Sequence, residues 1–293
     1  MNDKLGTDRA CALITGGGQG LGLALAHGCA RRGFDLLLVA LPGSGLDEAA
    51  QILQATYGVR CQALAQDLTA PDGPEAVARW ATDLGWPLAC LINNAGVSYN
   101  SRFEDSTLDE NEAVILVNNL APVKLTHLLL PELRKRERAY VLNVASLAAF
   151  FPMPFLTIYA TSKSFLVGFS LALRQEMRGT PVSVSVLCPN GLRTRPDCTA
   201  KNAQLGVFEG LFCMDAAPVA EIALRRTLSG AAIIVPGPLN RMLAALGRLV
   251  PRTVILSFVS AFWGRAARLK LSTHPTSARA RAVPREEEAA TGS

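Results

Sequence analysis

Three polar residues in the middle of the sequence have the types and spacing needed for acid–base chemistry at a carbonyl. Tyr159 and Lys163 are four residues apart, so on a helix they share one face and the ammonium lies near the phenol. A free tyrosine titrates near ~10, and a neighbouring cation is expected to lower its pKa towards working pH, where acid–base catalysis is most effective. Ser146 precedes the tyrosine and can hold a substrate oxygen beside it.

A glycine-rich segment near the start of the chain is typical of a turn that binds an anion. The segment 15–22 reads TGGGQGLG, and it stands between an apolar, strand-like run and a run with helical period. Glycines let the backbone approach a pyrophosphate, and the N-terminus of the following helix offers free N–H groups and the positive end of its dipole. This placement predicts a dinucleotide site.

Both groups of residues need a scaffold, and the hydrophobic pattern predicts an α/β fold. Short apolar runs alternate with longer helical segments, as in a parallel sheet buried on both faces by crossover helices. We expect strands at 11–15, 35–40, 61–66, 89–93, 140–144, 182–187 and 231–235, and helices at 20–32, 46–56, 73–84, 107–135, 157–178 and 216–228. The predicted fold is therefore a doubly wound, mostly parallel sheet, which binds ligands at the carboxyl ends of its strands.

The sequence resembles the classical short-chain dehydrogenase/reductase family over about residues 8–240. The resemblance lies in TGxxxGxG at 15–22, NNAG at 93–96, Ser146 and YxxxK at 159–163. It implies a Rossmann fold and an NAD(P)-dependent oxidoreductase that interconverts a carbonyl and a secondary alcohol by hydride transfer. It also implies that Asn118 sustains a proton relay, with Asn119 as the alternative. A pair of asparagines inside a helix is costly, so at least one should face a polar cavity.

The resemblance also implies the contacts to the cofactor. Asp67 and Leu68 would flank the adenine, 94–96 would line the adenosine ribose, and Lys163 would also reach the nicotinamide ribose. Asn190 stands where the family usually has glycine, and asparagine tolerates a positive φ, so we expect this loop beside the nicotinamide to persist with a slightly altered contact. The complete predicted set is Thr15, Gly16, Gln19, Gly20, Leu21, Gly22, Leu41, Asp67, Leu68, Asn94, Ala95, Gly96, Tyr159, Lys163, Pro189, Gly191 and Thr194.

The choice between NAD and NADP depends on the end of the second strand. An acidic residue there would bind the ribose 2′-OH of NAD and repel the 2′-phosphate of NADP, whereas an arginine would do the reverse. The strand ends at Ala40 and Leu41, and Gln19 in the glycine segment is also neutral. The missing acid favours NADP.

The segment between the sixth and seventh strands, about 195–217, is expected to cover the substrate. It contains the apolar residues Leu205, Val207, Phe208, Leu211, Phe212 and Met214. An apolar cover suits a hydrophobic substrate such as a lipid, a steroid or an acyl-derived ketone, because sugar hydroxyls would be left unpaired against it. The same side chains could instead only pack the cover onto the domain.

We divide the chain into a catalytic domain (1–240), a basic amphipathic helical extension (241–272) and a disordered tail (273–293). Residues 225–293 hold 11 of the 29 basic residues and 3 of the 24 acidic ones, so the net charge of +5 arises there. The extension could pack on the domain, form an oligomer contact or lie on an anionic membrane surface. The remainder has no basic stripe with interleaved aromatics, which argues against nucleic-acid binding.

Other features place the protein in the cytoplasm, with a peripheral membrane location if the extension binds lipid. There is no signal-peptide pattern and no run of 18 uncharged apolar residues. The seven scattered cysteines and three histidines show no metal-binding spacing, and we predict no metal.

The family resemblance implies a homo-oligomer built on the long helices 107–135 and 157–178. Two alternatives to the reductase remain: a dinucleotide-binding sensor or scaffold without catalysis, and an epimerase or dehydratase that uses the same tyrosine and lysine.

Overall fold

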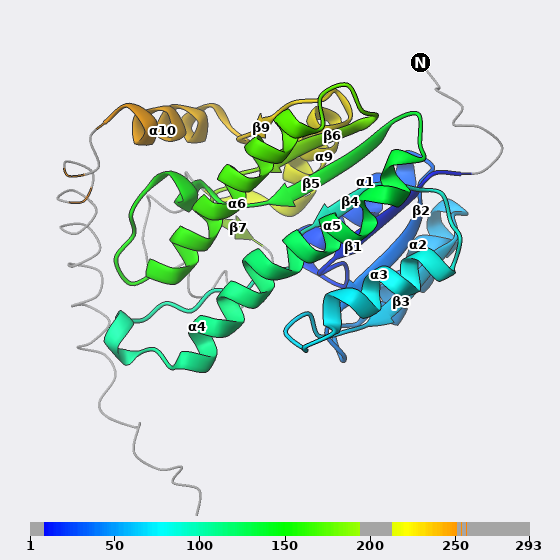
Figure 1. Cartoon of the computed structure of the whole chain (residues 1–293), viewed down its shortest axis with the longest axis horizontal. Helices are drawn as coiled ribbons and strands as arrows, with labels where there is room; N and C mark the ends of the chain where they lie inside the picture. The colour runs from blue at the N-terminus through cyan, green and yellow to red at the C-terminus, as the bar shows by residue number, and fades with distance from the viewer. Residues whose placement is uncertain (1–8, 194–212, 251–252, 254–255, 257–293) are drawn as a thin grey trace, which may run out of the picture.

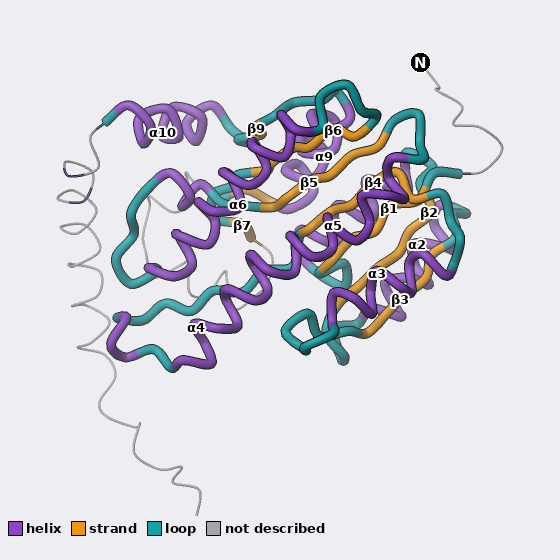
Figure 2. Tube along the Cα trace, in the orientation of Figure 1, coloured by secondary structure: helices purple, strands orange, loops and turns teal. Residues whose placement is uncertain are grey.

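The structure, a computed structural model, describes residues 9–193, 213–250, 253 and 256, which form three α/β/α layers (Figures 1 and 2). Its main sheet has seven parallel strands in the order β3-β2-β1-β4-β5-β6-β9. Their bounds are β1 (Cys11–Thr15), β2 (Asp35–Ala40), β3 (Cys61–Ala65), β4 (Leu88–Asn93), β5 (Ala139–Val144), β6 (Val182–Leu187) and β9 (Ile233–Ile234). The predicted doubly wound sheet is confirmed.

Helices cover both faces of this sheet. On one face α1 (Gly20–Arg31), α2 (Leu46–Tyr57) and α9 (Ala216–Leu228) enclose one hydrophobic cluster. On the other face α3 (Gly73–Asp83) and α5 (Ala121–Arg134) enclose a second cluster, and α6 (Thr157–Glu176) packs beside them. The strands are buried by both layers, which explains why their sequences are continuous apolar runs.

The chain reverses its direction of winding between β1 and β4, which are neighbours in the sheet. Ligands of open α/β sheets bind in the crevice outside the carboxyl ends of the strands at such a point. The glycine segment follows β1, and the NNAG segment spans the end of β4. The fold therefore brings together two of the motifs noted in the sequence.

The long helix expected at 107–135 has three parts. It begins at α4 (Leu108–Ile115), where Thr107 and Glu110 form a reciprocal capping box. A π-helical turn, η2 (Leu116–Leu120), follows and leads directly into α5. A π turn holds one extra residue, and such turns are frequent at functional sites.

By length and composition, one helical segment among the described residues, Leu108–Arg134, could cross a membrane. Its side chains Leu125, Leu129 and Leu133 are fully buried in the second hydrophobic cluster. A core helix of a soluble domain passes the same test, so this finding is weak evidence for a membrane span.

After β9 the chain forms α10 (Pro238–Leu249), so the expected boundary between 240 and 241 falls inside a helix. The helix ends at Val250, whose extended backbone is the conformation preferred before a proline, here Pro251. Most of a second amphipathic helix expected before residue 271 lies outside the described residues, as do the 273–293 tail and 194–212 of the expected cover. A short parallel pair that was not predicted, β7 (Leu192–Arg193) with β8 (Met214–Asp215), flanks that segment.

At the amino ends of the strands an ion pair joins the buried Asp35 of β2 to the half-exposed Arg60, which precedes β3. Asp35 is fully buried and accepts hydrogen bonds from the backbone N–H of Arg60 (2.8 Å) and from its Nε (2.7 Å). The Arg60 guanidinium also stacks 4.4 Å above the Trp86 ring. This contact lies at the opposite end of the sheet from the candidate site.

Candidate active site

The glycine segment forms a tight turn that can receive a phosphate. Gly16 and Gly20 have φ of +66° and +56°, a region that favours glycine. A Cβ on Gly22 would lie 2.0 Å from the Gly16 carbonyl oxygen. The N-cap of α1, Gln19, makes no side-chain capping bond, so the first N–H groups of the helix remain available to an anion. The segment therefore fits the pyrophosphate of a dinucleotide.

Thr15 and Asn94 bind the glycine turn to the loop after β4. Thr15 Oγ1 accepts the N–H groups of Asn94 and Ala95, both at 3.0 Å. Asn94 Nδ2 donates to the Thr15 carbonyl at 2.9 Å. These two polar side chains hold the two loops of the predicted cofactor site together. The sequence pattern alone could not distinguish this structural role from direct contact with the cofactor.

The predicted adenosine end has one exposed carboxylate and one buried leucine. Asp67 Oδ1 accepts the Thr69 N–H and hydroxyl, both at 2.8 Å, which orders the turn after β3. Leu68 is buried in the second hydrophobic cluster, so its side chain serves the core. Leu41, just after β2, is 54% exposed and leaves the expected 2′ position without a charge of its own.

Ser146, Tyr159 and Lys163 come together as the spacing predicted. Lys163, buried in α6, donates from Nζ to the Val144 carbonyl at 3.0 Å, and Nζ lies 5.7 Å from the centre of the Tyr159 ring. Ser146, at the end of β5, caps the short helix η3 (Leu147–Phe150) and shares a hydrogen bond with the Tyr159 side chain.

The predicted lowering of the Tyr159 pKa by Lys163 is wrong for this structure. Burial raises the pKa of the Tyr159 hydroxyl, and the hydrogen bond with Ser146 opposes that effect only in part. Burial lowers the pKa of Lys163 from 10.5 to about 8. Near neutral pH the phenol therefore keeps its proton, because desolvation outweighs the hydrogen bond with Ser146.

The π turn η2 presents both asparagines to α6. Asn118 is fully buried: its Oδ1 accepts the Val97 N–H at 2.9 Å, and its Nδ2 donates to the Val97 carbonyl and to Ser162 Oγ, each at 3.0 Å. Asn119 donates to the Ser162 carbonyl at 2.8 Å. Neither side chain is left unpaired in the core, which resolves the expected cost of a polar pair inside a helix.

Gly96 lies between Asn118 and Lys163. A Cβ at this position would be 3.2 Å from Asn118 Oδ1 and 3.2 Å from Lys163 Nζ. Of the two asparagines, it is the side chain of Asn118 that faces Gly96 together with the Lys163 ammonium. The contributions of Ser162 and the Val97 backbone were not predicted, because they depend on the packing of α6 against η2.

In the loop after β6, Asn190 does not use the positive φ that asparagine tolerates. Among the described non-glycine residues only Phe155 has a positive φ, so Asn190 does not need the left-handed region here. Asn190 Oδ1 instead accepts the Gly191 N–H at 2.9 Å, and the buried Pro189 accepts the Leu147 N–H at 2.7 Å. Thr194 lies outside the described residues.

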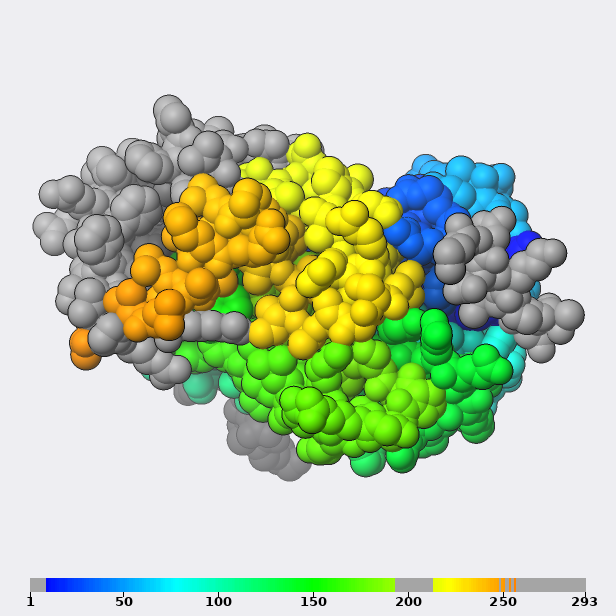
Figure 3. All heavy atoms as spheres, turned by 90° about the horizontal axis from the view of Figure 1, so that it is seen from above, coloured from blue at the N-terminus to red at the C-terminus, as the bar shows by residue number. Residues whose placement is uncertain are grey.

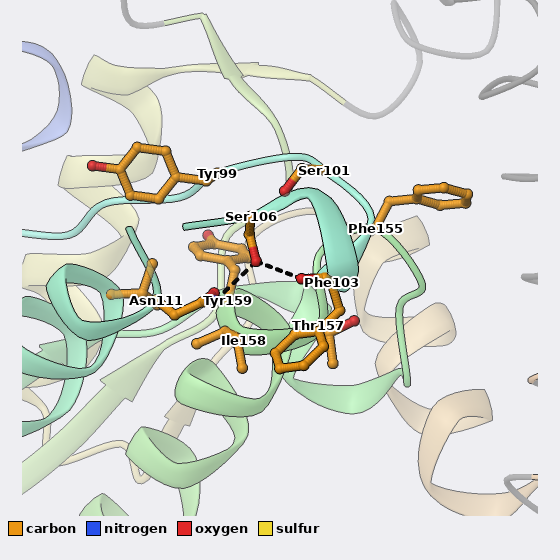
Figure 4. Close-up of a pocket in the computed structure, with 10 residues that line it drawn as sticks. Tyr99, Ser101, Phe103, Ser106, Asn111, Phe155, Thr157, Ile158 and Tyr159 are labelled. Carbon is orange, nitrogen blue, oxygen red and sulfur yellow. Dashed lines mark hydrogen bonds between the residues drawn. The ribbon is translucent and has the colours of Figure 1, made fainter. Parts of the chain in front are cut away.

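A pocket beside Tyr159 contains both apolar and polar side chains (Figure 4). Ser106 lies at its centre, where it donates to the Phe103 carbonyl at 2.8 Å and accepts from Asn111 Nδ2 at 2.9 Å. The lining is Tyr99, Ser101, Phe103, Ser106, Asn111, Val114, Phe155, Thr157, Ile158 and Tyr159. Segments far apart in the chain build this pocket, so no local sequence signal could have found it.

Among the described residues no group of three or more His, Cys, Asp or Glu could hold a metal ion.

Comparison with known proteins places this geometry in context. Residues 10–204 match the family model described as short chain dehydrogenase. The chain is 34% identical over 177 residues to the ketoacyl reductase HetN of Nostoc sp. (60% of this chain, 61% of HetN). It is 32% identical over 186 residues to the human 17-beta-hydroxysteroid dehydrogenase type 3 (62% of this chain, 59% of that protein). The chain thus spans about three fifths of the length of these relatives.

The fold is also shared with solved structures. A short-chain dehydrogenase from Sphingobium yanoikuyae in complex with NADPH superposes with a TM-score of 0.69 at 27% identity, covering 93% of this chain and 98% of that one. The similarity therefore extends over nearly the whole of both chains.

Proposed function

This chain belongs to the short chain dehydrogenase family, and from that premise we propose that it is an NAD(P)-dependent oxidoreductase that interconverts a carbonyl and a secondary alcohol. One observation carries the proposal: Ser146, Tyr159, Lys163 and Asn118 lie at the edge of the sheet where a turn suited to a pyrophosphate also lies. The combination supports catalysis over a sensor or scaffold, which would need the turn alone.

The proton chemistry follows from the pKa directions. Tyr159 is protonated near neutral pH, so it can donate its proton to the oxygen of a carbonyl that is being reduced. Ser146 bonds Tyr159 and can hold that oxygen beside it. Lys163 can return a proton to the tyrosine, and Asn118, which flanks Gly96 with it, would help to hold the water that relays the proton. A nicotinamide, when bound, supplies the hydride.

The cofactor would be held by the glycine turn and by the loops after β2, β3, β4 and β6. The absence of an acid at Leu41 supports NADP over NAD. The relative from Sphingobium yanoikuyae binds NADPH, which is consistent with this preference.

The substrate is proposed to be hydrophobic, an acyl-derived or steroid ketone. Apolar side chains, among them Val114 and Ile158, line part of the pocket beside Tyr159. The names of the two relatives describe a ketoacyl reductase and a hydroxysteroid dehydrogenase, which are enzymes of such substrates.

A peripheral contact with an anionic membrane is proposed for α10. Met242, Leu246 and Leu249 are 60%, 51% and 82% exposed, and their spacing places them on one side of the helix. The basic C-terminal region would add electrostatic attraction to a location otherwise in the cytoplasm. In a flotation assay with phosphatidylserine vesicles, the wild-type protein should rise with the vesicles. A variant with both Met242→Gln and Leu246→Gln should remain in the bottom fraction.

Self-association is proposed through the long helices, where Leu120 and Leu128 remain exposed beside buried neighbours. Light scattering after size-exclusion chromatography should give a mass that is a multiple of 31.2 kDa. A monomer at micromolar concentration would contradict this part of the proposal.

The test of the activity is a fluorescence titration with NADPH and NADH, followed by cofactor oxidation against long-chain 3-oxoacyl and steroid ketones. Tyr159→Phe should keep cofactor affinity within about twofold and reduce turnover by roughly a thousandfold, because only the transferable proton is lost. Binding without turnover on any ketone would support the sensor, and no binding would overturn the proposal. Turnover by Tyr159→Phe at the wild-type rate would remove the tyrosine from the mechanism.

A further inference from the structure

The C-terminal helix α10 is bonded to the loop that follows β6. Asn190 Nδ2 donates to Asn240 Oδ1 at 3.0 Å, across fifty residues of sequence. Asn240 lies in the first turn of α10, is 4% exposed, and donates from Nδ2 to the Pro236 carbonyl at 2.9 Å. The pair is therefore a partly buried amide bridge between the helix and the loop.

The same Asn190 side chain orders the backbone that follows it. Its Oδ1 accepts the Gly191 N–H at 2.9 Å, so its amide group binds both α10 and its own loop. Glycine at this position could make neither bond. The residue that departs from the usual family pattern is thus the one that connects the loop to the helix.

The second half of α10 contacts the turn that begins at Ser146. A Cβ on Gly247 would lie 2.9 Å from the Phe150 carbonyl oxygen and 2.9 Å from Cε1 of Phe151. Phe150 is the last residue of η3, and Ser146 is its N-cap, accepting the Ala148 N–H at 3.1 Å. Close packing at Gly247 therefore fixes the end of the turn whose start carries the serine.

The two loops are also bonded to each other, since Leu147 donates its N–H to the Pro189 carbonyl at 2.7 Å. Three segments, the turn at 146–150, the loop at 188–191 and α10, thus form a closed set of contacts at one end of the sheet. In the space-filling view α10, in orange, lies on the surface beside the yellow atoms of the segment that precedes it (Figure 3).

We propose that α10 positions both active-site loops, with Asn190 and Asn240 as positioning residues for the loop that receives the nicotinamide end and Gly247 as the positioning residue for the Ser146 turn. This inference rests on the proposed function. Ordering a flexible loop residue costs conformational entropy. A loop that the protein already holds does not incur that cost on binding, so its ligand binds more tightly.

The amide bridge is tested by NADPH titration of Asn190→Ala, Asn240→Ala and the double variant. Each single variant should bind NADPH about tenfold more weakly, and the double variant should be no worse than about the worse single one, because one bridge is lost in every case. Asn190→Gly, which restores the usual family residue, should behave like Asn190→Ala. Glu221→Ala, which breaks an ion pair between α9 and α1, is the control and should bind like wild type.

The packing contact is tested by Gly247→Ala in the same assays. It should lower kcat by about tenfold or more with a ketone while NADPH affinity stays within about twofold, because it displaces the serine turn and leaves the amide bridge intact. Gly168→Ala is the matched control, since a Cβ at that helical glycine of α6 meets no atom within 4 Å. It should leave kcat unchanged.

The outcomes separate this inference from the proposed function. Wild-type protein that binds neither NADPH nor NADH contradicts the function itself. Wild-type binding and turnover, with unchanged NADPH affinity in Asn240→Ala and Asn190→Gly, would overturn the bridge. Additive losses of NADPH affinity in the double variant would show two independent structural effects and would also overturn the bridge. An unchanged kcat in Gly247→Ala would show that α10 does not position the Ser146 turn.

Discussion

Replacing Lys163 with methionine should stabilise the folded protein near neutral pH. The side chain is 4% exposed, and burial lowers its pKa from 10.5 to about 8. One pKa unit corresponds to ~1.4 kcal/mol, so keeping the charged form in the folded state costs on the order of 3 kcal/mol. Methionine fills a similar space without a charge, and losing the hydrogen bond to Val144 offsets about 1 kcal/mol. A net gain of roughly 2 kcal/mol is expected.

The pH dependence gives the sign of this prediction. Because the folded-state pKa lies below the unfolded value, the lysine destabilises the fold fully below about pH 8. Between there and 10.5 the unfolded chain holds more protons than the folded one, so wild-type stability rises with pH. The advantage of the variant should therefore shrink over this interval and reverse above it, where only the lost hydrogen bond of about 1 kcal/mol remains.

The assay is urea unfolding without cofactor, monitored by circular dichroism at several pH values across that interval. Lys124→Met is the matched control, because Lys124 is partly exposed and pairs with Glu75 at 2.7 Å, so its removal should give no gain. A Lys163→Met protein less stable than wild type near neutral pH, or an advantage that does not change with pH, would refute the reasoning. Its ketone turnover should be lost even as it becomes more stable.

Two further predictions concern the two ends of the sheet. Leu41→Asp should raise the ratio of the NADPH dissociation constant to the NADH dissociation constant by about tenfold, because the new carboxylate repels a 2′-phosphate. Fluorescence titration measures this ratio, and an unchanged ratio would mean that another residue recognises the 2′ position. Asp35→Asn should lower the free energy of unfolding by about 2 kcal/mol, since the buried carboxylate that pairs with the Arg60 guanidinium is lost. Urea unfolding measures this loss. NADPH affinity, measured by titration, should stay constant, and weaker binding would contradict the assignment of this contact to stability alone.

The sequence predicted the sheet well because its signal is local. Continuous apolar runs such as 36–39 fit only strands that are buried on both faces, and the turns after them carry the polar motifs. The spacing of Tyr159 and Lys163 likewise fixes their shared face without any knowledge of the tertiary structure.

The remaining features depend on contacts between distant segments. The bond between Asn190 and Asn240 joins residues fifty positions apart, and nothing near either residue indicates it. The raised pKa of Tyr159 depends on how deeply the packed structure buries the phenol. Sequence spacing gave the right neighbours in this case, but it could not show how strongly burial desolvates the phenol.

The π turn makes the length of the 108–134 segment as important as its composition. Deleting a single residue from Leu116–Leu120 would let the segment form a regular α-helix while α4 and α5 keep their mutual orientation, because the wide turn already accommodates the extra residue. Val114 would therefore stay buried, whereas Asn118 would lose the bulged backbone that presents its side chain to Val97. A single deletion at this turn would thus preserve the core and disturb the site.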